Sequence, residues 1–191
     1  IVSLSHPLSA EMDVLRPSIL PGTLDILAYN ARKGQHDNRF YEIGRVFQKN
    51  TEGSIEEALQ LALTITGARN PLFWTGSNRD DLADIYDLKG ALDEFLERFG
   101  VFGVRFVAEQ NPTDEASLKQ SLFIESAELL MGRQCIGRIG TVSPWIQKEI
   151  DARSPVFMAE IDLGILLQRR ASSRSFKKLP GYPAVRRDIA M

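Results

Sequence analysis

The sequence has few of the residues that most often carry catalytic or metal chemistry. Its 191 residues include one cysteine, Cys135, and two histidines, His6 and His36, which lie far apart in the chain. A disulfide framework is therefore excluded within this chain, and no zinc-type ligand spacing exists. Because Cys135 stands inside a predicted strand, we expect it to pack in the interior rather than act as a nucleophile. The sequence predicts no catalytic residue and no metal site.

Sequence signals for nucleotides and membranes are missing as well. No glycine-rich loop followed by Lys and Ser or Thr is present, so the phosphate loop of many nucleotide-binding proteins is absent. Gly137 and Gly140 fall in a predicted strand, where glycine more often marks a bulge or close packing. No apolar run approaches the roughly 20 residues that span a bilayer, and the first residues show no signal-peptide pattern. We expect no cofactor bound by this chain, no membrane partner and a cytoplasmic location.

The composition is that of a folded domain, with 43% apolar and 25% charged residues. The chain begins at Ile1 without an initiator methionine, and both ends have strand-like sequences. We interpret it as a fragment of a larger polypeptide.

Charge is spread unevenly although the net charge is only −2. Residues 169–191 contain seven Arg or Lys against one acid, Asp188. Such a basic end is typical either of a solvated linker or of a surface that faces nucleic acid. The sequence leaves both interpretations open.

Hydrophobic periodicity predicts an α+β fold. Helices are expected from Leu20 to Gly34, over 84–99, over 144–149 and over 163–168, and strands over 40–47, 58–66, 101–108, 121–131, 134–142 and 155–163. The strands cluster in hairpins instead of alternating with helices, so we expect a mainly antiparallel sheet with flanking helices. Gly90, inside the second helix, is expected to let another element approach closely.

The strand over 40–47 has apolar residues and one charge on each face, so we expect both of its faces to be covered. Covered charges need partners. A salt bridge from Glu42 to Arg45 or Arg16 is favoured over acid–base chemistry, and the Glu42–Arg45 pair is the predicted structural ion pair.

Seven segments follow one ordered pattern along nearly the whole chain. They are residues 7–11 (Pro-Leu-Ser-Ala-Glu), 14–22 (Val-Leu-Arg-Pro-Ser-Ile-Leu-Pro-Gly), 41–47 (Tyr-Glu-Ile-Gly-Arg-Val-Phe), 86–90 (Tyr-Asp-Leu-Lys-Gly), 137–140 (Gly-Arg-Ile-Gly), 155–160 (Pro-Val-Phe-Met-Ala-Glu) and 182–190 (Tyr-Pro-Ala-Val-Arg-Arg-Asp-Ile-Ala). Each segment alone is weak evidence, but their order and spacing are specific. The chain resembles the core of the phenylalanyl-tRNA synthetase beta subunit.

This resemblance implies a domain related to class II aminoacyl-tRNA synthetase catalytic domains but without catalytic function. The implied partner is the alpha subunit, which holds the phenylalanine and ATP site and uses magnesium, in an α2β2 heterotetramer that charges tRNA. Residues 1–170 would form the core, and residues 171–191 a basic linker and the first strand of an anticodon-binding domain that continues beyond this chain.

The resemblance also suggests which residues have roles. Those expected to face the alpha subunit are Arg16, Pro17, Pro21 and Asn30, and those expected to face tRNA are Arg186 and Arg187. A class II site needs arginines for the ATP phosphates, but Gln48 and Lys49 follow the second-motif strand and Gly164 opens the late helix. The family's later His-Pro is Ser143-Pro144 here, and its earlier His-Pro-Gly is replaced by Leu-Phe-Ile at 122–124.

An alternative stays open at this stage. The chain would then be a stand-alone nucleotide-binding or tRNA-binding module without a synthetase partner. Calorimetry with ATP and magnesium separates the two hypotheses, since the scaffold interpretation predicts no binding.

Overall fold

A six-stranded sheet organises the part of the chain that the computed structural model describes, which is residues 1–7, 9, 13–70, 81–110 and 115–169. Every neighbouring pair in it is antiparallel. The order across the sheet is β3 (Asn38–Lys49), β4 (Ile55–Thr66), β8 (Val156–Asp162), β7 (Gln134–Val142), β6 (Phe123–Met131) and β5 (Val104–Ala108). A separate two-stranded sheet pairs β1 (Val2–Ser3) with β2 (Val14–Leu15). The predicted α+β fold with a mainly antiparallel sheet is confirmed.

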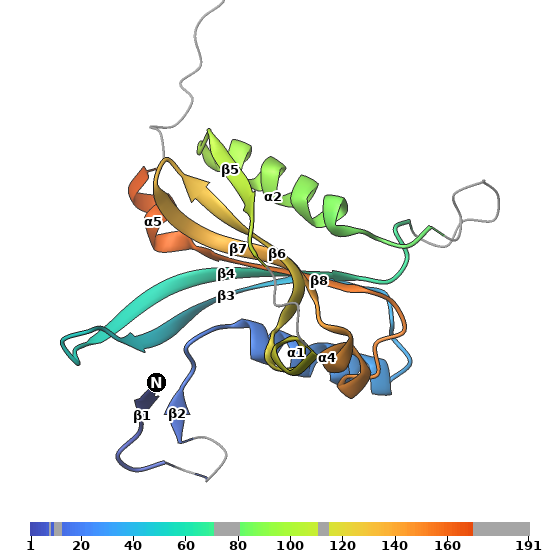
Figure 1. Cartoon of the computed structure of the whole chain (residues 1–191), viewed down its shortest axis with the longest axis horizontal. Coiled ribbons are helices and arrows are strands. Elements are labelled where there is room, and N and C mark those ends of the chain that lie inside the picture. The colour runs from blue at the N-terminus through green and yellow to red at the C-terminus, as the bar shows by residue number, and fades with distance from the viewer. Residues whose placement is uncertain (8, 10–12, 71–80, 111–114, 170–191) are drawn as a thin grey trace, which may run out of the picture.

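Helices cover both faces of this sheet (Figure 1). The helices are α1 (Leu20–Arg32), α2 (Ile85–Phe99), α3 (Glu115–Gln120), α4 (Pro144–Glu149) and α5 (Leu163–Arg169). The longest, α2, lies on one face, whereas α1 and α4 lie together on the other. Among the described helices, none combines the length and the apolar character needed to cross a membrane.

Local sequence explains where the two long helices begin and end. Pro21 occupies the first turn of α1, where its missing N–H has no intrahelical partner to lose. Just past the end of α1, Gly34 has the positive φ of +78° that favours glycine. Asp84 caps α2 with a reciprocal capping box to Asp87, and Gly100 ends that helix in the left-handed region. These features confirm both predicted helices.

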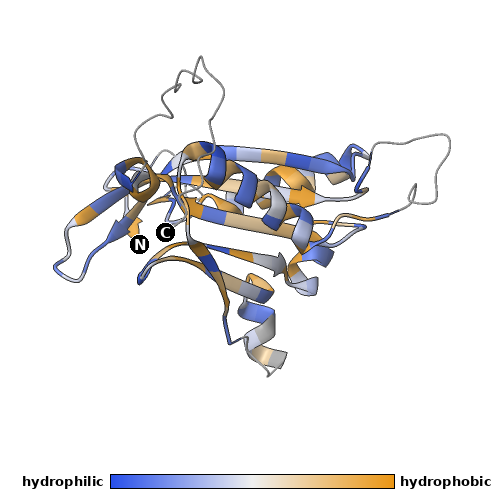
Figure 2. Ribbon diagram, turned by 90° about the horizontal axis from the view of Figure 1, so that it is seen from above, coloured by the Kyte–Doolittle hydropathy of each residue, from blue (hydrophilic) through white to orange (hydrophobic). Residues whose placement is uncertain are grey.

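Two hydrophobic clusters form the core, one on each face of the sheet. The larger cluster joins α2 and α5 to β4, β6, β7 and β8, with Leu88, Leu92 and Leu166 fully buried. The smaller one joins α1 and α4 to the opposite face, around Ile19 and Met158. Hydrophobic residues are spread along the strands of the sheet (Figure 2), and buried apolar residues of α1, α2 and α5 pack against it. The sheet is therefore the shared middle layer of both clusters.

Three packing predictions are wrong. Gly90 faces open space, since a Cβ added there would meet nothing within 4 Å. Cys135 is exposed near the start of β7, where the chain has just turned at the sheet's rim. The third error concerns β3, an edge strand of which one face carries Tyr41 and Ile43 with exposed fractions of 71% and 52%. Apolar periodicity does not show which strand lies at the edge of a sheet, and for this reason the sequence predicts a covered strand here.

The remaining element predictions agree with the structure apart from their ends. The hairpin of β6 and β7 turns at Gly132, whose φ is +65°. The fifth strand starts only at Val104, because Gly103 has a φ of +76° and ends the preceding extended run. Ser143 stands at the N-cap position of α4 as predicted, but its side chain makes no capping hydrogen bond. The predicted strand at 185–191 lies outside the described residues.

Candidate functional site

A row of polar side chains crosses the sheet on the face where α1 lies. Directly opposed residues in an antiparallel pair lie on the same face, and the registers connect one residue from each of five neighbouring strands. The row is Glu42 of β3, Ala62 of β4, Glu160 of β8, Arg138 of β7 and Glu128 of β6. Four of these five side chains are charged, which is unusual for the middle of a sheet.

Three residues of this row, Glu128, Arg138 and Glu160, line an open groove with a volume of about 650 Å³. Ser18 and Leu20 of the α1 entrance lie along one side, and Ile165 of α5 lies at another. Three carboxylates line the groove, those of Glu128, Glu160 and Asp162, together with a single guanidinium, that of Arg138. The groove is thus a predominantly acidic cleft on the sheet.

Glu160 ties the start of α1 to this face. Its Oε1 accepts hydrogen bonds from the backbone N–H of Ile19 at 2.7 Å and from the Ser18 hydroxyl at 2.9 Å, and Ser18 Oγ also lies 3.0 Å from Oε2. An orphan N–H donor at a helix start is usually satisfied by a nearby side chain. Here the acceptor comes from a strand far along the sequence, so the entrance of α1 depends on the tertiary fold.

The electrostatics of Glu160 are set mainly by burial. Removal from water raises the pKa of its carboxyl, and the Ile19 N–H, the Ser18 hydroxyl and the charge of Arg138 only partly offset this. The net direction is upward. Glu160 is therefore a carboxylate held in a costly environment by the contacts that it makes with α1.

Arg16 fastens the chain before α1 to β3. Its Nη1 lies 2.7 Å from Glu42 Oε1, and its Nε donates to the Arg45 carbonyl at 2.9 Å. The Phe47 N–H donates to the Arg16 carbonyl at 2.9 Å. Gly44 makes this possible, since a Cβ there would lie 2.1 Å from Arg16 Nη2. The guanidinium thus crosses the strand over Gly44, and a larger residue there would require the Arg16 side chain to move.

The predicted Glu42–Arg45 ion pair is wrong. Arg45 follows Glu42 by three positions, an odd number, which places the two side chains on opposite faces of a strand. Glu42 pairs with Arg16, the other partner that the sequence had suggested, and Arg45 pairs with Glu57 on β4. The Arg16–Glu42 pair is partly exposed, with side-chain exposed fractions of 45% and 28%, so it is not the buried bridge that was expected.

Among the described residues, the two arginines that reach this face are already engaged. Arg16 is held by Glu42, and Arg138 Nη2 lies 2.8 Å from Glu109 Oε1. An incoming phosphate would have to compete with these carboxylates and would also meet the acids of the groove. No group of three or more His, Cys, Asp or Glu side chains within the described residues is arranged to hold a metal ion. The geometry suits hydrogen-bond donors and cations better than anions.

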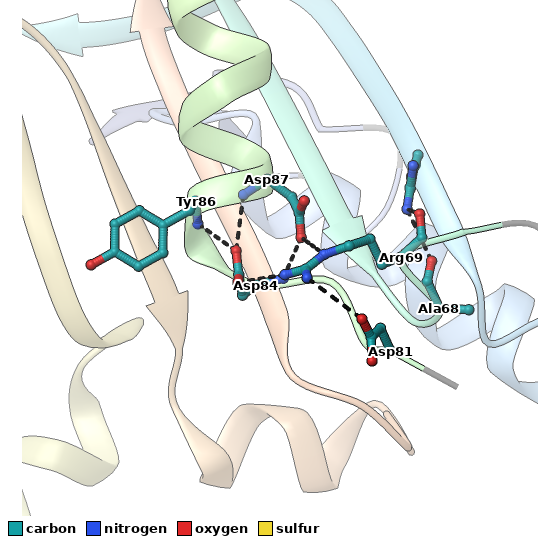
Figure 3. Close-up of polar contacts among 7 residues, drawn as sticks. Ala68, Arg69, Asp81, Asp84, Tyr86 and Asp87 are labelled. Atoms are coloured by element: carbon teal, nitrogen blue, oxygen red, sulfur yellow. Dashed lines mark hydrogen bonds and ion pairs between the residues drawn. The ribbon is translucent and has the colours of Figure 1, made fainter. Parts of the chain in front are cut away.

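A second polar cluster lies at the opposite face, where α2 begins (Figure 3). Arg69 reaches three aspartates there, with Nε 3.0 Å from Asp87 Oδ2, Nη2 2.5 Å from Asp84 Oδ2 and Nη1 4.0 Å from Asp81 Oδ2. Its backbone N–H also donates to the Asp81 carbonyl at 2.7 Å. The cluster joins the end of β4 to the first turn of α2.

The charges of this cluster stabilise one another. The hydrogen bond to Asp87 is the main cause of an upward shift in the pKa of Arg69. Burial by itself would raise the pKa of Asp87, but the N–H of Asp84 and the Arg69 guanidinium outweigh it, so the net shift is downward. Negative charge at a helix N-terminus also interacts favourably with the helix dipole. The cluster is best explained as a structural cap and shows no vacant acid or base.

The predicted interface residues do not form one patch with the groove. Pro17 and Pro21 are exposed beside the α1 entrance, whereas Asn30, near the end of α1, is half-buried and donates from Nδ2 to Asn38 Oδ1 at 2.6 Å. Arg186 and Arg187 lie outside the described residues. The structure brings Arg16 and Pro17 close to the groove and leaves Asn30 at the far end of the helix.

The sequence did not reveal the central contact of either cluster. These contacts are Ser18 with Glu160 on the groove face and Arg69 with Asp87 at the start of α2. The spacing of Asp84 and Asp87 before an apolar helical stripe resembles a capping box and could have revealed their pairing. No local signal connects Ser18 with Glu160, which lie 142 positions apart in the sequence. That contact comes only from folding.

Comparison with known proteins identifies the family. Residues 1–163 match the family described as "Phenylalanyl tRNA synthetase beta chain CLM domain". The chain belongs to this family. Similar proteins include phenylalanine–tRNA ligase beta subunits of Dehalococcoides mccartyi, 32% identical over 100% of this chain, and of Bacillus licheniformis, 33% identical over 98% of it. The chain spans 22% of the length of each of these relatives.

Solved structures agree with the family at the level of fold. Pyrrolysyl-tRNA synthetase from Desulfitobacterium hafniense superimposes with a TM-score of 0.58 at 16% sequence identity, over 89% of this chain and 57% of that one. At this identity the likeness concerns the fold alone. The beta-chain domain described here therefore has the class II aminoacyl-tRNA synthetase fold that the resemblance implied.

Proposed function

We propose that this chain is the synthetase-like domain of a phenylalanine–tRNA ligase beta subunit. It packs on the alpha subunit in the cytoplasm and supports ATP-dependent charging of tRNA with phenylalanine, without performing the chemistry itself. The observation that carries this proposal is the family match over residues 1–163, together with relatives that are named as beta subunits of this ligase.

The groove supports the catalytically inactive part of the proposal. Stabilising a triphosphate requires cationic groups aimed at its oxygens. In this domain Arg16 and Arg138 are bound to Glu42 and Glu109, and Glu128 faces the same groove. ATP and magnesium would then be used at a site that another subunit provides.

Calorimetry tests the absence of a substrate site. We expect titration of ATP with magnesium, and of phenylalanine, into the chain to give no heat beyond dilution. The cognate alpha and beta holoenzyme provides the positive control under the same conditions. Micromolar binding of ATP by this chain alone would contradict the proposal and favour a stand-alone nucleotide-binding module.

Association with the alpha subunit tests the scaffold role. The surface proposed for this contact includes Arg16, Pro17, Pro21 and Asn30, around and along α1. Pro17→Arg is expected to weaken co-elution with the alpha subunit in size-exclusion chromatography, because a charge is placed on an exposed apolar contact. Pro155→Arg, at an exposed position before β8, is the matched control. Equal co-elution of both variants would remove the α1 entrance from the interface.

Contact with tRNA is the remaining part of the proposal. Arg186 and Arg187 would contribute phosphate contacts, so replacing both with Ala is expected to reduce the slope of affinity against salt concentration. The measurement is filter binding of tRNA at several salt concentrations. If the dependence of tRNA affinity on salt concentration is unchanged, Arg186 and Arg187 do not contact tRNA phosphates, and the basic end serves only to keep the chain soluble.

A further inference from the structure

Strand β3 lies at one edge of the sheet, and one end of its outer side is covered by the chain before α1. There the Phe47 N–H donates to the Arg16 carbonyl at 2.9 Å, and Arg16 Nε donates to the Arg45 carbonyl at 2.9 Å. Along an antiparallel strand, residues alternately direct both backbone groups to one side or the other. Because the register of β3 with β4 runs without a shift, every second residue before Arg45 also directs its N–H and C=O away from the sheet.

Three residues form this open edge, namely Arg39, Tyr41 and Ile43. Within the described part of the chain, no hydrogen bond reaches their outward N–H and C=O groups. The side chains of Tyr41 and Ile43 beside the edge are largely exposed. Edge strands are usually protected by shortening, bulges or proline, but β3 has 12 residues, no proline and no register shift. A regular edge with exposed apolar side chains is typical of a site that accepts another strand.

The charges along this edge favour a second copy of β3 as that strand. In a two-fold antiparallel pair centred on Tyr41, the two Tyr41 residues are opposed and Arg39 lies opposite Ile43 of the other copy. The same register sets Arg45 opposite Asp37, so opposite charges meet at both ends. A shift by two residues in one direction would oppose Arg39 to Arg45, which repel each other. The opposite shift would set Ile43 against the Asp37 carboxylate.

The two end charges keep capacity for this second contact. Arg45 pairs with Glu57 through Nη1, and Asp37 Oδ1 accepts from the Ala68 N–H at 2.8 Å. A guanidinium has further N–H donors, and a carboxylate accepts at both of its oxygens. Each group can therefore keep its contact within the chain and meet the opposite charge of another copy.

We propose that the β3 edge binds a second copy of this chain, with the two β3 strands paired antiparallel about Tyr41 in one continuous sheet. The opposed pairs formed by Arg39, Tyr41 and Ile43 would exchange about six backbone hydrogen bonds. The two Tyr41 rings would form an aromatic cross-strand pair, which is a favourable combination. The contact uses neither the alpha subunit nor tRNA, so it stands apart from the proposed function.

Cross-linking tests both the contact and its register. Directly opposed residues of this kind have Cα atoms about 5.5 Å apart, which is within the range of a disulfide. In the 191-residue chain with Cys135→Ser, we expect Tyr41→Cys to form a linked dimer under mild oxidation, measured on a non-reducing gel. Tyr86→Cys, on α2 and with 74% of the residue exposed, controls for random collision. Tyr41→Cys should link about tenfold faster, because pairing makes the reaction internal to one complex.

A second cysteine position distinguishes the proposed register from its neighbours. In the pair centred on Tyr41, the two copies of residue 43 lie four positions apart along the strands, or about 14 Å. Ile43→Cys should therefore link no faster than the Tyr86→Cys control. Faster linking of Ile43→Cys than of Tyr41→Cys would contradict the register.

Charge variants at one position test the pairing without a cross-link. Sedimentation of the parent chain should show a mass that rises with concentration toward twice the 21.4 kDa of one chain. Ile43→Glu sets a carboxylate opposite Arg39 of the other copy, and Ile43→Lys sets a like charge there. The dissociation constant of the Lys variant should exceed that of the Glu variant by about tenfold, since two such cross-strand pairs form in each dimer.

A backbone variant tests the hydrogen bonds themselves. Tyr41→Pro removes one outward N–H from each copy, whereas the ladder from β3 to β4 does not use that N–H. Dimerisation should weaken by about tenfold or more, because two hydrogen bonds are lost. Circular dichroism checks that the variant is folded, and the Ile43 variants decide the question if it is not.

The outcomes divide as follows. Selective linking of Tyr41→Cys together with a weaker Ile43→Lys dimer supports pairing through β3. A parent chain that sediments as a monomer up to about 0.1 mM overturns the proposal. A dimer with equal dissociation constants for Ile43→Glu and Ile43→Lys also overturns it, since the contact would then use another surface.

Discussion

The two faces of the central sheet use the same strands for different purposes. The face under α2 and α5 is apolar and tightly closed, with Leu88, Leu92 and Leu166 completely buried. The face toward α1 is apolar only at one end, around Ile19 and Met158, and at the other it opens into a groove lined by carboxylates. Along β8 the two faces alternate residue by residue, since Ile161 belongs to the closed face and Glu160 to the open one.

This difference separates stability from function within one sheet. Burial of apolar side chains supplies most of the favourable free energy of folding, so the α2 face can stabilise the domain by itself. Buried or half-buried charges such as Glu160 usually cost stability unless they are fully paired. A polar row retained in the middle of a sheet is therefore where a binding role should be sought. Four changes test the division, beginning with the largest expected effect.

The closed face should be the most sensitive to truncation. Leu88→Ala is expected to lower the free energy of unfolding by about 2–5 kcal/mol, because it opens a cavity in a fully buried part of α2. Tyr86→Ala, on the same helix with 74% of the residue exposed, should change it by less than about 0.5 kcal/mol. Urea unfolding followed by circular dichroism measures both. Similar losses for the two variants would mean that α2 does not pack as described.

The close contact between β7 and β8 at Gly137 should not tolerate even one added methyl group. A Cβ at Gly137 would lie 2.3 Å from the Glu160 carbonyl oxygen and 2.9 Å from Ile161 Cα, both backbone atoms that cannot move aside alone. Gly137→Ala is expected to cost about 1–3 kcal/mol. Gly90→Ala, in open space on α2, should instead stabilise by about 0.5–1 kcal/mol. A stabilising effect at both positions in thermal melts would refute the close approach of β7 and β8.

The start of α2 should depend on its polar cap more than α4 does on Ser143. Asp84→Ala removes a capping side chain and an Arg69 contact, so a loss of about 1 kcal/mol is expected in urea unfolding at pH 7. Ser143→Ala should be nearly neutral, because its buried hydroxyl makes no capping hydrogen bond. A Ser143→Ala loss as large as that of Asp84→Ala would contradict the assignment of Asp84 as the stabilising cap.

The same cap should depend on pH through Asp87. The pKa of Asp87 is lowered, so the stability that this group adds is present above its ordinary pKa and is lost as the pH falls through the folded-state value.

A substitution on the open face, at Glu160, should give the smallest effect. It should change how the free energy of unfolding depends on pH. The pKa of Glu160 is raised by burial, so its contribution to stability is present below its ordinary pKa and falls as the pH rises through the folded-state value. Glu160→Gln can still accept from the Ile19 N–H and carries no charge. Its stability relative to the parent should therefore increase as the pH rises across that window.

Unfolding in urea at a series of pH values measures this difference. Glu125→Gln on the exposed part of β6 controls for the loss of one negative charge. Parallel stability curves for the parent and Glu160→Gln would show that burial does not penalise the carboxylate.

Much of the fold could be read from the order of residues alone. Helix boundaries at Pro21, Gly34 and Gly100, and the hairpin turn at Gly132, follow from backbone rules that act over a few residues. Apolar periodicity also marks the stripe of α2 correctly, because that helix packs along one continuous face. The ordered family segments add the identity of the domain, which no single motif carries.

The candidate site was recovered less well. Arg16 and Glu42 were both singled out, but Arg45 was placed with the wrong partner, Cys135 was expected in the core and Glu160 had no assigned role. Each of these errors concerns a relation between distant strands or the position of a strand in the sheet. The edge position of β3 and the neighbourhood of β4 and β8 are set by topology, and a one-dimensional pattern does not contain them.

The sequence by itself determined the local elements, the α+β class and the family of this domain, because turn chemistry, capping and periodicity act between neighbouring residues. Only the tertiary structure decided that Ser18 meets Glu160, that Arg16 crosses Gly44, and that acids from two strands, β6 and β8, line one groove. The physical reason is that register and strand order bring together residues far apart in the sequence, and the free energy of a buried charge depends on what then surrounds it.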